Sequence, residues 1–342
     1  MRRGRVKINK KKIYSFLIGV GVFLLSFSLF ELKGFAQSIK IDEWIETEQQ
    51  SSIEIIDREE KKSASQKSTN ENFLLLHNNG EPINTNIING KTDFYLEAIS
   101  KNKVNGMEVI DYYFNQVDNK ERDLSDIKET ASERSKEILN DIKNEKNIDS
   151  SQYSTFAVAS VSNPVVRNFN WTFNSSSHYL TTTVEMSRRS SNASINGVKG
   201  SVWDVITNTQ YERKTGLRYL NNLYTRLAVP YTYQTLLDWG PASTNSGDVS
   251  VSLSGAGVPG ISYNFSTGTL YNTSDLSSKS SKYGRWKFSR AVYPVYANRL
   301  TTRPAIRSSN TKGNFALQLS HSLVFDNVTN NTGVITITTP DR

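Results

Sequence analysis

Basic and aromatic residues are concentrated together between positions 282 and 307 of this chain. A Tyr or Trp ring on a surface offers a flat face to a sugar or a lipid head group, and the forked guanidinium group of Arg pairs with phosphate or carboxylate. The segment therefore predicts a site that binds an anionic polymer or membrane head groups. The candidate binding residues are Lys282, Tyr283, Arg285, Trp286, Lys287, Arg290, Arg299, Arg303 and Arg307.

The same segment also has a structural interpretation. Trp286 and Phe288 flank Lys287, an alternation typical of a strand with one face in a core and the other in solvent. In this interpretation most of the aromatic rings are core residues and the cations lie on the surface. A basic face remains as the candidate site in either case.

Residues that would support catalysis or metal binding form no recognisable motif. The histidines His77, His178 and His321 are far apart in the sequence, and neither an H-E-x-x-H nor a G-x-S-x-G motif occurs. His321 stands between Leu319 and Leu323 on an alternating segment, which favours a histidine packed at the edge of a core. We therefore expect no catalytic residue, no metal site and no cofactor, and we favour a protein that is not an enzyme.

A hydrolase that acts on wall or host glycans is one alternative. Such an enzyme uses two carboxylates that flank the bond to be cleaved. Asp204, Glu212 and Asp238 are the candidates in the basic half of the chain, and their spacing selects no pair.

A pore-forming toxin is the other alternative. Residues 175–209 are rich in Ser and Thr, alternate with apolar residues and contain a central Asn-Gly turn, as a membrane-inserting hairpin would. A strand that crosses a membrane needs ~9–11 residues with one apolar face. Arg188 and Arg189 interrupt the first arm and Asp204 lies in the second, which argues against insertion of this segment.

The N-terminal segment has the order of a secretory signal. A basic stretch without acids precedes the uncharged apolar run Ile13–Phe30, and a small-residue cleavage site ends at Ala36. We expect residues 1–36 to be a signal peptide that is cleaved after Ala36; an uncleaved anchor is the alternative, since the run approaches the length of a spanning helix. The chain has no cysteine, which is typical of exported proteins of Gram-positive bacteria. The protein is therefore predicted to be secreted or at the cell surface.

The formal net charge of +8 comes almost wholly from the predicted signal. Residues 1–36 hold eight Lys and Arg and one acid, which leaves 41 − 8 = 33 bases and 33 − 1 = 32 acids, a net charge of +1. This near neutrality argues against a nucleic-acid partner. The remaining charge is uneven, because residues 37–150 carry 15 bases and 24 acids (−9) and residues 151–342 carry 18 bases and 8 acids (+10).

This asymmetry indicates that the acidic half is a detachable or masking pro-region for the basic half. An ordinary N-terminal domain or stalk is the alternative. The sequence does not define an oligomeric state.

The acidic half divides into two parts. Residues 37–72 are polar and charged, with too few apolar side chains to offset the entropy of ordering, and are expected to be flexible. Within residues 73–150, apolar side chains recur at three- and four-residue spacing over Met107–Val117 and again over Leu124–Ile142. This spacing predicts a small, mostly helical region.

From residue 151 the apolar period changes to two, and turn residues separate the alternating segments. The pattern predicts an antiparallel β-sandwich over residues 151–342, so the expected fold class is α+β. Residues 217–227 fit a helical stripe and are interpreted as a short helix between two strands. The expected strands are Tyr179–Met186, Val202–Tyr211, Val249–Leu253, Ile261–Phe265, Trp286–Phe288, Phe315–Leu319 and Val334–Thr339.

One stretch has a wider likeness. The sequence SVSLSGAGVPGISYNFSTGTLYNTSDLSSKSSKYGRWKF joins a serine-alternating strand, a Gly/Pro turn, an aromatic strand and a W-x-F strand. It resembles a recurring pattern in uncharacterised secreted β-rich proteins of Gram-positive bacteria. The resemblance implies an exported β-rich module and transfers no site residue.

Overall fold

The computed structural model describes residues 52–55, 73–76, 82–84, 94–104, 107–116, 164–173, 177–216, 218–242, 245–291, 297–326 and 328–339. The chain divides into two compact units, Met1–Gln49 and Gln50–Arg342, and every described residue belongs to the second. The predicted signal peptide and the predicted helix over Leu124–Ile142 lie outside the described residues.

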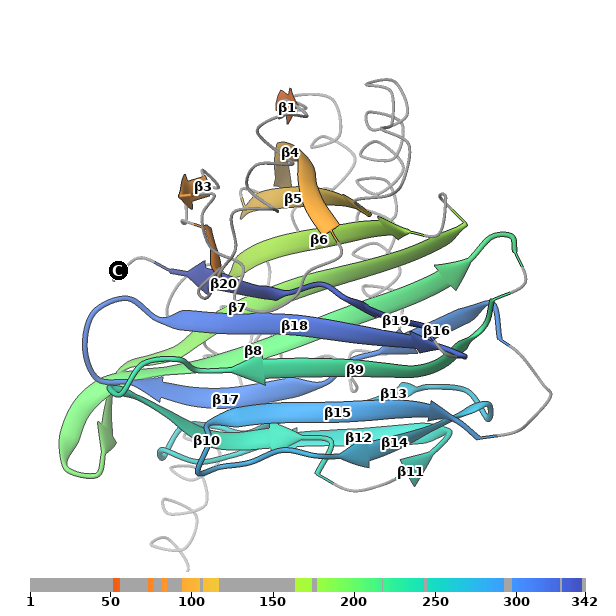
Figure 1. The fold of residues 1–342 in the computed structure, drawn as a ribbon. Helices are drawn as coiled ribbons and strands as arrows, with labels where there is room; N and C mark the ends of the chain where they lie inside the picture. Colours follow the sequence, from red (N-terminus) through yellow and green to blue (C-terminus); the bar gives the residue numbers. More distant parts are fainter. Residues whose placement is uncertain are drawn as a thin grey trace, which may run out of the picture. The chain divides into compact units, whose positions relative to one another are not determined.

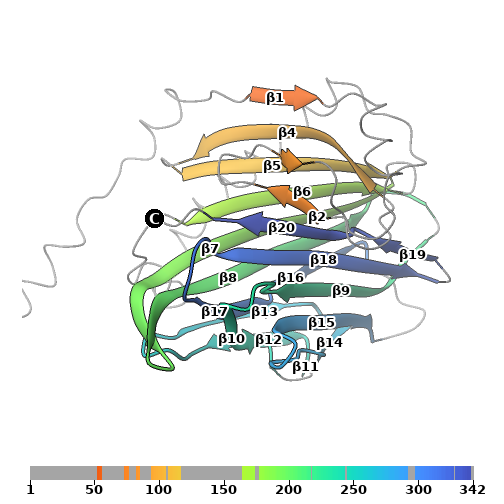
Figure 2. The same cartoon turned by 60° about the vertical axis from the view of Figure 1, so that its left-hand side comes forward.

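The described residues form two nine-stranded sheets and one separate hairpin (Figure 1). Figure 2 shows the first strands of sheet A following one another in their paired order. In spatial order, sheet A contains β1 (Ser52–Ile55), β4 (Phe94–Val104), β5 (Met107–Gln116), β6 (Val165–Phe173), β7 (His178–Ile195), β8 (Val198–Arg213), β17 (Ala305–Asn310) and β10 (Gln234–Gly240), and β16 (Arg299–Thr302) also pairs with β8.

Sheet B and the hairpin complete the fold. Sheet B contains β11 (Asn245–Ser246), β14 (Tyr271–Asp275), β15 (Tyr283–Arg290), β9 (Leu220–Ala228), β18 (Ala316–Phe325), β20 (Val334–Thr338), β2 (Phe73–Leu76) and β3 (Pro82–Asn84), and β19 (Val328–Asn331) pairs with β18. The hairpin consists of β12 (Asp248–Leu253) and β13 (Ile261–Ser266). The pairings are antiparallel except for β5 with β6 and β2 with β20, which are parallel.

Sheets A and B pack face to face around one apolar core. Thr182 of β7 is hydrogen-bonded to His321 of β18 at 2.9 Å, and the ring of Trp171 on β6 meets the same histidine edge-on. Trp203 of β8 stacks on Phe315, with ring centroids 5.1 Å apart. These contacts place side chains of the two sheets against one another.

The prediction of an α+β fold was wrong, because the described part of the chain is all-β. Residues 107–116, placed in a helical region by their spacing, form β5, and residues 73–76, at the start of the region predicted to be mostly helical, form β2. In β5 the consecutive residues from Val109 to Asn115 are all buried, since the strand is paired on both edges and covered on both faces. Such a continuous run lacks a period of two and imitates a helical stripe. No helix among the described residues is long and apolar enough to cross a membrane.

The interpretation of residues 217–227 as a short helix was also wrong, since Leu220–Ala228 forms β9. Leu223, Thr225 and Leu227 point inward at alternate positions. Thr225 occupies a core position because its hydroxyl is hydrogen-bonded to His321 at 3.1 Å. Because this inward position holds a polar residue, the alternation of apolar residues along the strand is interrupted in the sequence.

Strands from residues 73–116 share both sheets with strands from residues 165–338. The parallel pair β5–β6 makes this connection in sheet A, and the parallel pair β2–β20 makes it in sheet B. Removal of residues 37–150 would therefore expose the edges of β6 and β20, and an exposed strand edge pairs readily with another chain. Masking of the basic half by residues 37–150 stays a prediction.

Candidate functional site

Strand β15 carries the centre of the predicted binding segment. Its side chains alternate, so Tyr283, Arg285 and Lys287 face outward from sheet B while Trp286 points into the core. The buried indole of Trp286 donates a hydrogen bond to the Pro241 carbonyl at 2.8 Å. The interpretation of Trp286 as a core residue is confirmed, and it is not available to a ligand.

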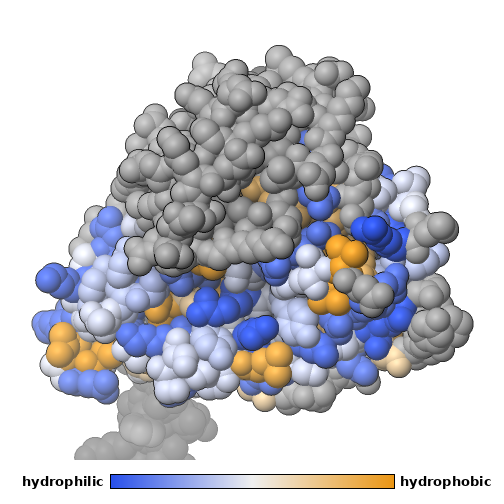
Figure 3. All heavy atoms as spheres, in the orientation of Figure 1, coloured by the Kyte–Doolittle hydropathy of each residue, from blue (hydrophilic) through white to orange (hydrophobic). Residues whose placement is uncertain are grey.

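Strand β9 adds two residues to the same outward face. Tyr224 lies opposite Lys287, and Arg226 lies opposite Arg285. Arg285 is exposed and the other members are partly exposed. We name Tyr224, Arg226, Tyr283, Arg285 and Lys287 the cationic–aromatic face. Figure 1 shows β9 and β15 side by side, and Figure 3 shows the surface in that orientation as largely hydrophilic with small separate hydrophobic patches.

Cations and rings are interleaved across the cationic–aromatic face. The guanidinium carbon of Arg226 lies 4.8 Å from the ring centroid of Tyr283, and that of Arg285 lies 5.2 Å from the ring of Tyr224. The Lys287 ammonium lies 5.9 Å from the ring centroid of Tyr224. Each ring thus lies within cation–π distance of a neighbouring cation.

The electrostatics of this face favour an anion. Arg226 and Arg285 are directly opposite each other, and like charges at such positions destabilise a sheet. Burial lowers the pKa of Arg226, Tyr283 opposes this shift, and the charge of Arg285 adds to it. Among the described residues, no ion pair joins a member of this face to a carboxylate. A bound phosphate would relieve the repulsion between the arginines.

Exposed apolar side chains lie at one end of the face. Lys282 donates hydrogen bonds from its ammonium group to the carbonyls of Tyr231 at 3.0 Å and Thr232 at 3.4 Å. Tyr231 is 38% exposed, and Leu276, whose amide bonds the carbonyl of Arg285, is 43% exposed. An aromatic and an aliphatic side chain therefore border the cations on the surface.

Three of the predicted arginines lie elsewhere. Arg290 is partly exposed at the end of β15, opposite Tyr271. Arg299 on β16 forms an exposed ion pair with Glu212 at 2.9 Å. Arg303 follows β16, with its guanidinium carbon 5.4 Å from the Tyr263 ring. The structure therefore does not bring these arginines into the cationic–aromatic face.

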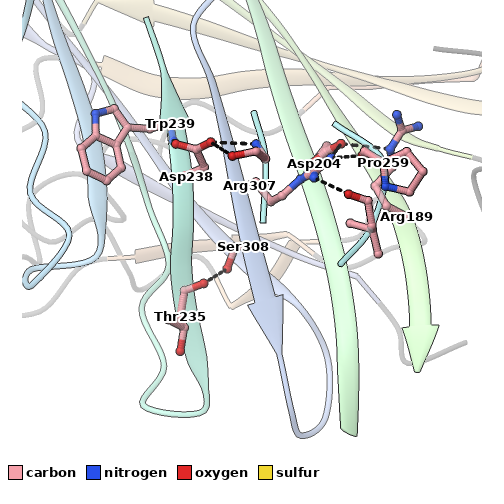
Figure 4. A network of polar contacts seen from close by, with 10 residues as sticks. Arg189, Asp204, Thr235, Asp238, Trp239, Pro259, Arg307 and Ser308 are labelled. Atoms are coloured by element: carbon pink, nitrogen blue, oxygen red, sulfur yellow. Dashed lines mark hydrogen bonds and ion pairs between the residues drawn. The ribbon is translucent and has the colours of Figure 1, made fainter. Parts of the chain in front are cut away.

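Arg307 is buried and has a structural partner (Figure 4). Its guanidinium group forms a two-point ion pair with Asp204, with N–O distances of 2.6 and 2.8 Å. The same group donates to the Pro259 carbonyl at 2.9 Å, and Arg189 bonds Asp204 from the other side at 2.9 Å. Arg307 holds strands together and is not a surface ligand-binding residue.

The described histidines belong to the core. Burial lowers the pKa of His178 to about 4, with a smaller contribution from Arg213, and lowers the pKa of His321 to about 3. Both side chains are neutral at pH 7. The prediction of a packed histidine at position 321 is confirmed, and His77 lies outside the described residues.

The carboxylates proposed for a glycan hydrolase are engaged in structural contacts. Asp204 is buried between two arginines, and Glu212 pairs with Arg299. Asp238 accepts hydrogen bonds from the amide and hydroxyl of Ser254 at 2.7 and 3.0 Å. Each of the three therefore has a partner within the fold.

Sequence reasoning missed Tyr224 and Arg226. They alternate with the inward residues Leu223, Thr225 and Leu227. Their outward position can be predicted from the sequence only if Thr225 is treated as an inward residue. The pairing of β9 with β15, which brings Arg226 opposite Arg285, is a long-range fact that no local pattern contains.

No protein-family model matches the chain, and no curated protein matches it. Among solved structures, a protein described as "Pore forming protein" has a TM-score of 0.30 and 8% identity, covering 52% of this chain and 87% of that one. The C-terminal domain of the Streptococcus pyogenes antigen I/II-family protein AspA has a TM-score of 0.25 and 8% identity, covering 47% of this chain and 54% of that one. At these TM-scores the likenesses carry no argument about function.

Proposed function

We propose that this β-rich chain, exported by its N-terminal signal, is a surface-interaction protein that binds anionic membrane head groups through the cationic–aromatic face. The observation that carries the proposal is the pair Arg226 and Arg285, which lie opposite each other without a carboxylate partner among the described residues. Lys287 adds a third cation at the next outward position of β15, two residues after Arg285.

A membrane surface fits this face better than a soluble polymer. The cations lie on neighbouring strands of one sheet, so they can meet several phosphates of a flat surface at once. Tyr231 and Leu276 are exposed at the border, and aromatic side chains are favoured where an apolar layer meets water. A soluble sugar chain would need the cations but would gain little from Leu276.

The test is sedimentation of the purified protein with vesicles. Phosphatidylglycerol vesicles should retain the protein at low salt, phosphatidylcholine vesicles should retain much less, and salt should weaken retention because it screens exposed charges. The triple variant R226Q/R285Q/K287Q removes three cations worth about 1 kcal/mol each at an anionic surface, so binding should weaken roughly a hundredfold.

The matched control is K199Q/K214Q/K312Q, which removes the same charge from exposed positions outside the face. If the control loses as much binding as R226Q/R285Q/K287Q, net charge and not the face is responsible, and the proposed site is wrong. Retention on a column of anionic polysaccharide without retention on vesicles would instead assign the face to a polymer.

A further inference from the structure

The hairpin β12–β13 is paired only with itself among the described residues. Its two strands form a separate sheet in which Asp248 is opposite Ser266 and Leu253 is opposite Ile261. By contrast, every other described strand is part of sheet A or sheet B. No backbone ladder therefore ties this hairpin to the body of the fold.

The hairpin has one apolar and one polar face. Its inward residues are all buried, and its outward serines and asparagine are exposed. The inward residues are Val249, Val251, Leu253, Ile261, Tyr263 and Phe265. This strict alternation is typical of a strand with an apolar environment on one side and water on the other; the apolar environment is the core in this structure and lipid in a membrane strand.

The segment around the hairpin contains no charge. Residues 249–274, between Asp248 and Asp275, hold no Asp, Glu, Lys, Arg or His. The paired arms Asp248–Leu253 and Ile261–Ser266 have six residues each, so a membrane-crossing arm of ~9–11 residues has to draw residues from the turn region as well. The turn region from Ser254 to Gly260 is also uncharged and rich in glycine.

Side-chain contacts hold the hairpin on the body. Asp238 of β10 accepts two hydrogen bonds from Ser254, and Arg307 of β17 donates to the carbonyl of Pro259. The Tyr263 hydroxyl donates to the Arg303 carbonyl at 2.7 Å. These contacts act at the turn and along one strand, while the inward side chains of the hairpin belong to the same apolar core as those of sheets A and B.

Close packing supplements these polar contacts. A Cβ atom at Gly240 would lie 2.8 Å from Cγ1 of Val251, so the glycine lets β12 lie directly over β10. Ala256 and Val258 pack against the small cluster of Ala193, Ile195 and Val202 at the tip of β7–β8. Undocking exposes the apolar face to water, which is unfavourable unless lipid replaces the lost contacts.

We propose that the β12–β13 hairpin leaves the body and inserts into a lipid bilayer, with its valine and leucine side in lipid and its serine side toward water. The inference rests on the proposed function, because the cationic–aromatic face brings the chain to the membrane. In lipid the outer edges of a lone hairpin would keep unpaired N–H and C=O groups, which are costly there. Hairpins of several copies pair edge to edge, and their serine faces line a water-filled pore.

A reversible clamp tests the insertion. The chain has no cysteine, so the double variant Asp238→Cys/Ser254→Cys carries only the two introduced thiols. The side chains at these positions already converge, with Asp238 Oδ2 3.0 Å from Ser254 Oγ, and a disulfide there would fix the turn to β10. Loss of free thiols confirms closure of the clamp.

The readout is release of a trapped dye from phosphatidylglycerol vesicles, measured beside sedimentation. We expect the parent protein and the reduced double variant to release dye, and the oxidised variant to bind vesicles with loss of release. The single variants Asp238→Cys and Ser254→Cys should release dye in oxidising buffer. Release by the oxidised clamp, or vesicle binding by the parent without release, overturns the insertion and leaves the proposed function standing. Absence of vesicle binding by the parent overturns the proposed function itself.

Discussion

The two hairpins β7–β8 and β12–β13 share an alternation of Ser or Thr with apolar residues, and the structure holds them in different ways. β7 and β8 pair with each other and also with β6 and β17 on their outer edges. They bury Arg189 and Asp204 as an ion pair. Insertion of this hairpin would break its ladders with β6, β16 and β17 and move charges into lipid.

The β12–β13 hairpin has neither obstacle. Its outer edges carry no ladder among the described residues, and the segment between Asp248 and Asp275 has no charge. Alternation alone therefore does not identify a hairpin that can move. The pairing of its outer edges and the charges along its arms decide the matter.

The largest expected effect concerns the ion pairs that lock β7–β8. Asp204→Ala removes the carboxylate that bonds the buried guanidinium groups of Arg189 and Arg307, which should lower the free energy of unfolding by about 3–5 kcal/mol. Glu212→Ala breaks the exposed pair with Arg299 and should cost only about 0–1 kcal/mol. Urea unfolding measures both. Equal costs would mean that the buried network does not secure this hairpin.

The next effect is a loss of stability in acid. The unfolded chain protonates its histidines below pH 6.5, whereas the folded chain resists until about pH 4 at His178 and about pH 3 at His321. The stability that the two neutral, buried histidines contribute is therefore fully present above pH 6.5 and is lost progressively as the pH falls below that value. Each histidine contributes a slope of up to about 1.4 kcal/mol per pH unit.

This pH dependence concerns the hairpin β7–β8, because His178 is the first residue of β7 and His321 is hydrogen-bonded to Thr182 of β7. Glu185 on the same strand has a pKa raised by burial, so its protonation in acid partly offsets the loss. Urea unfolding at pH 7 and pH 5 should show a shallower pH slope in His321→Gln than in the parent. An unchanged slope would place the acid-sensitive group elsewhere.

A smaller effect distinguishes the two faces of β12. Val251→Asp places a charge on the apolar face and should reduce dye release at least tenfold, or about 1.4 kcal/mol. Ser252→Asp places the same charge on the exposed face, where it should leave release intact and favour passage of cations. Equal losses of dye release in the two variants would contradict the proposed orientation of β12 in the bilayer.

Much of the strand structure was predictable, because one face of a strand in water repeats every second residue. The expected strands at Val249–Leu253, Ile261–Phe265 and Phe315–Leu319 correspond to β12, β13 and β18. The pattern failed in β5, which is buried on both faces, and in β9, where Thr225 replaces an apolar residue. Alternation in the sequence arises because one face of a strand is buried and the other is exposed, so it does not identify a strand that is buried on both faces.

The candidate site was predicted in part for the same reason. Arg285 and Lys287 face outward, as their alternation with Trp286 indicates. Arg307 was misplaced because its strand, Ala305–Asn310, is buried throughout and its serines imitate a surface sequence. Arg226 was missed because only the tertiary pairing of β9 with β15 places it beside Arg285.

The smallest effect needs no substitution. Because β12 and β13 lack outer ladders, their amides should exchange with deuterium faster than those of β7 and β8, through local opening that leaves both large sheets intact. Mass spectrometry of peptides covering residues 248–266 and 178–213 measures the difference. Phosphatidylglycerol vesicles should then slow exchange in the first peptide, since insertion pairs the free edges, and should leave the second unchanged. If both hairpins exchange at the rate of global unfolding, β12–β13 is as firmly held as β7–β8, and the contrast between them has no dynamic consequence.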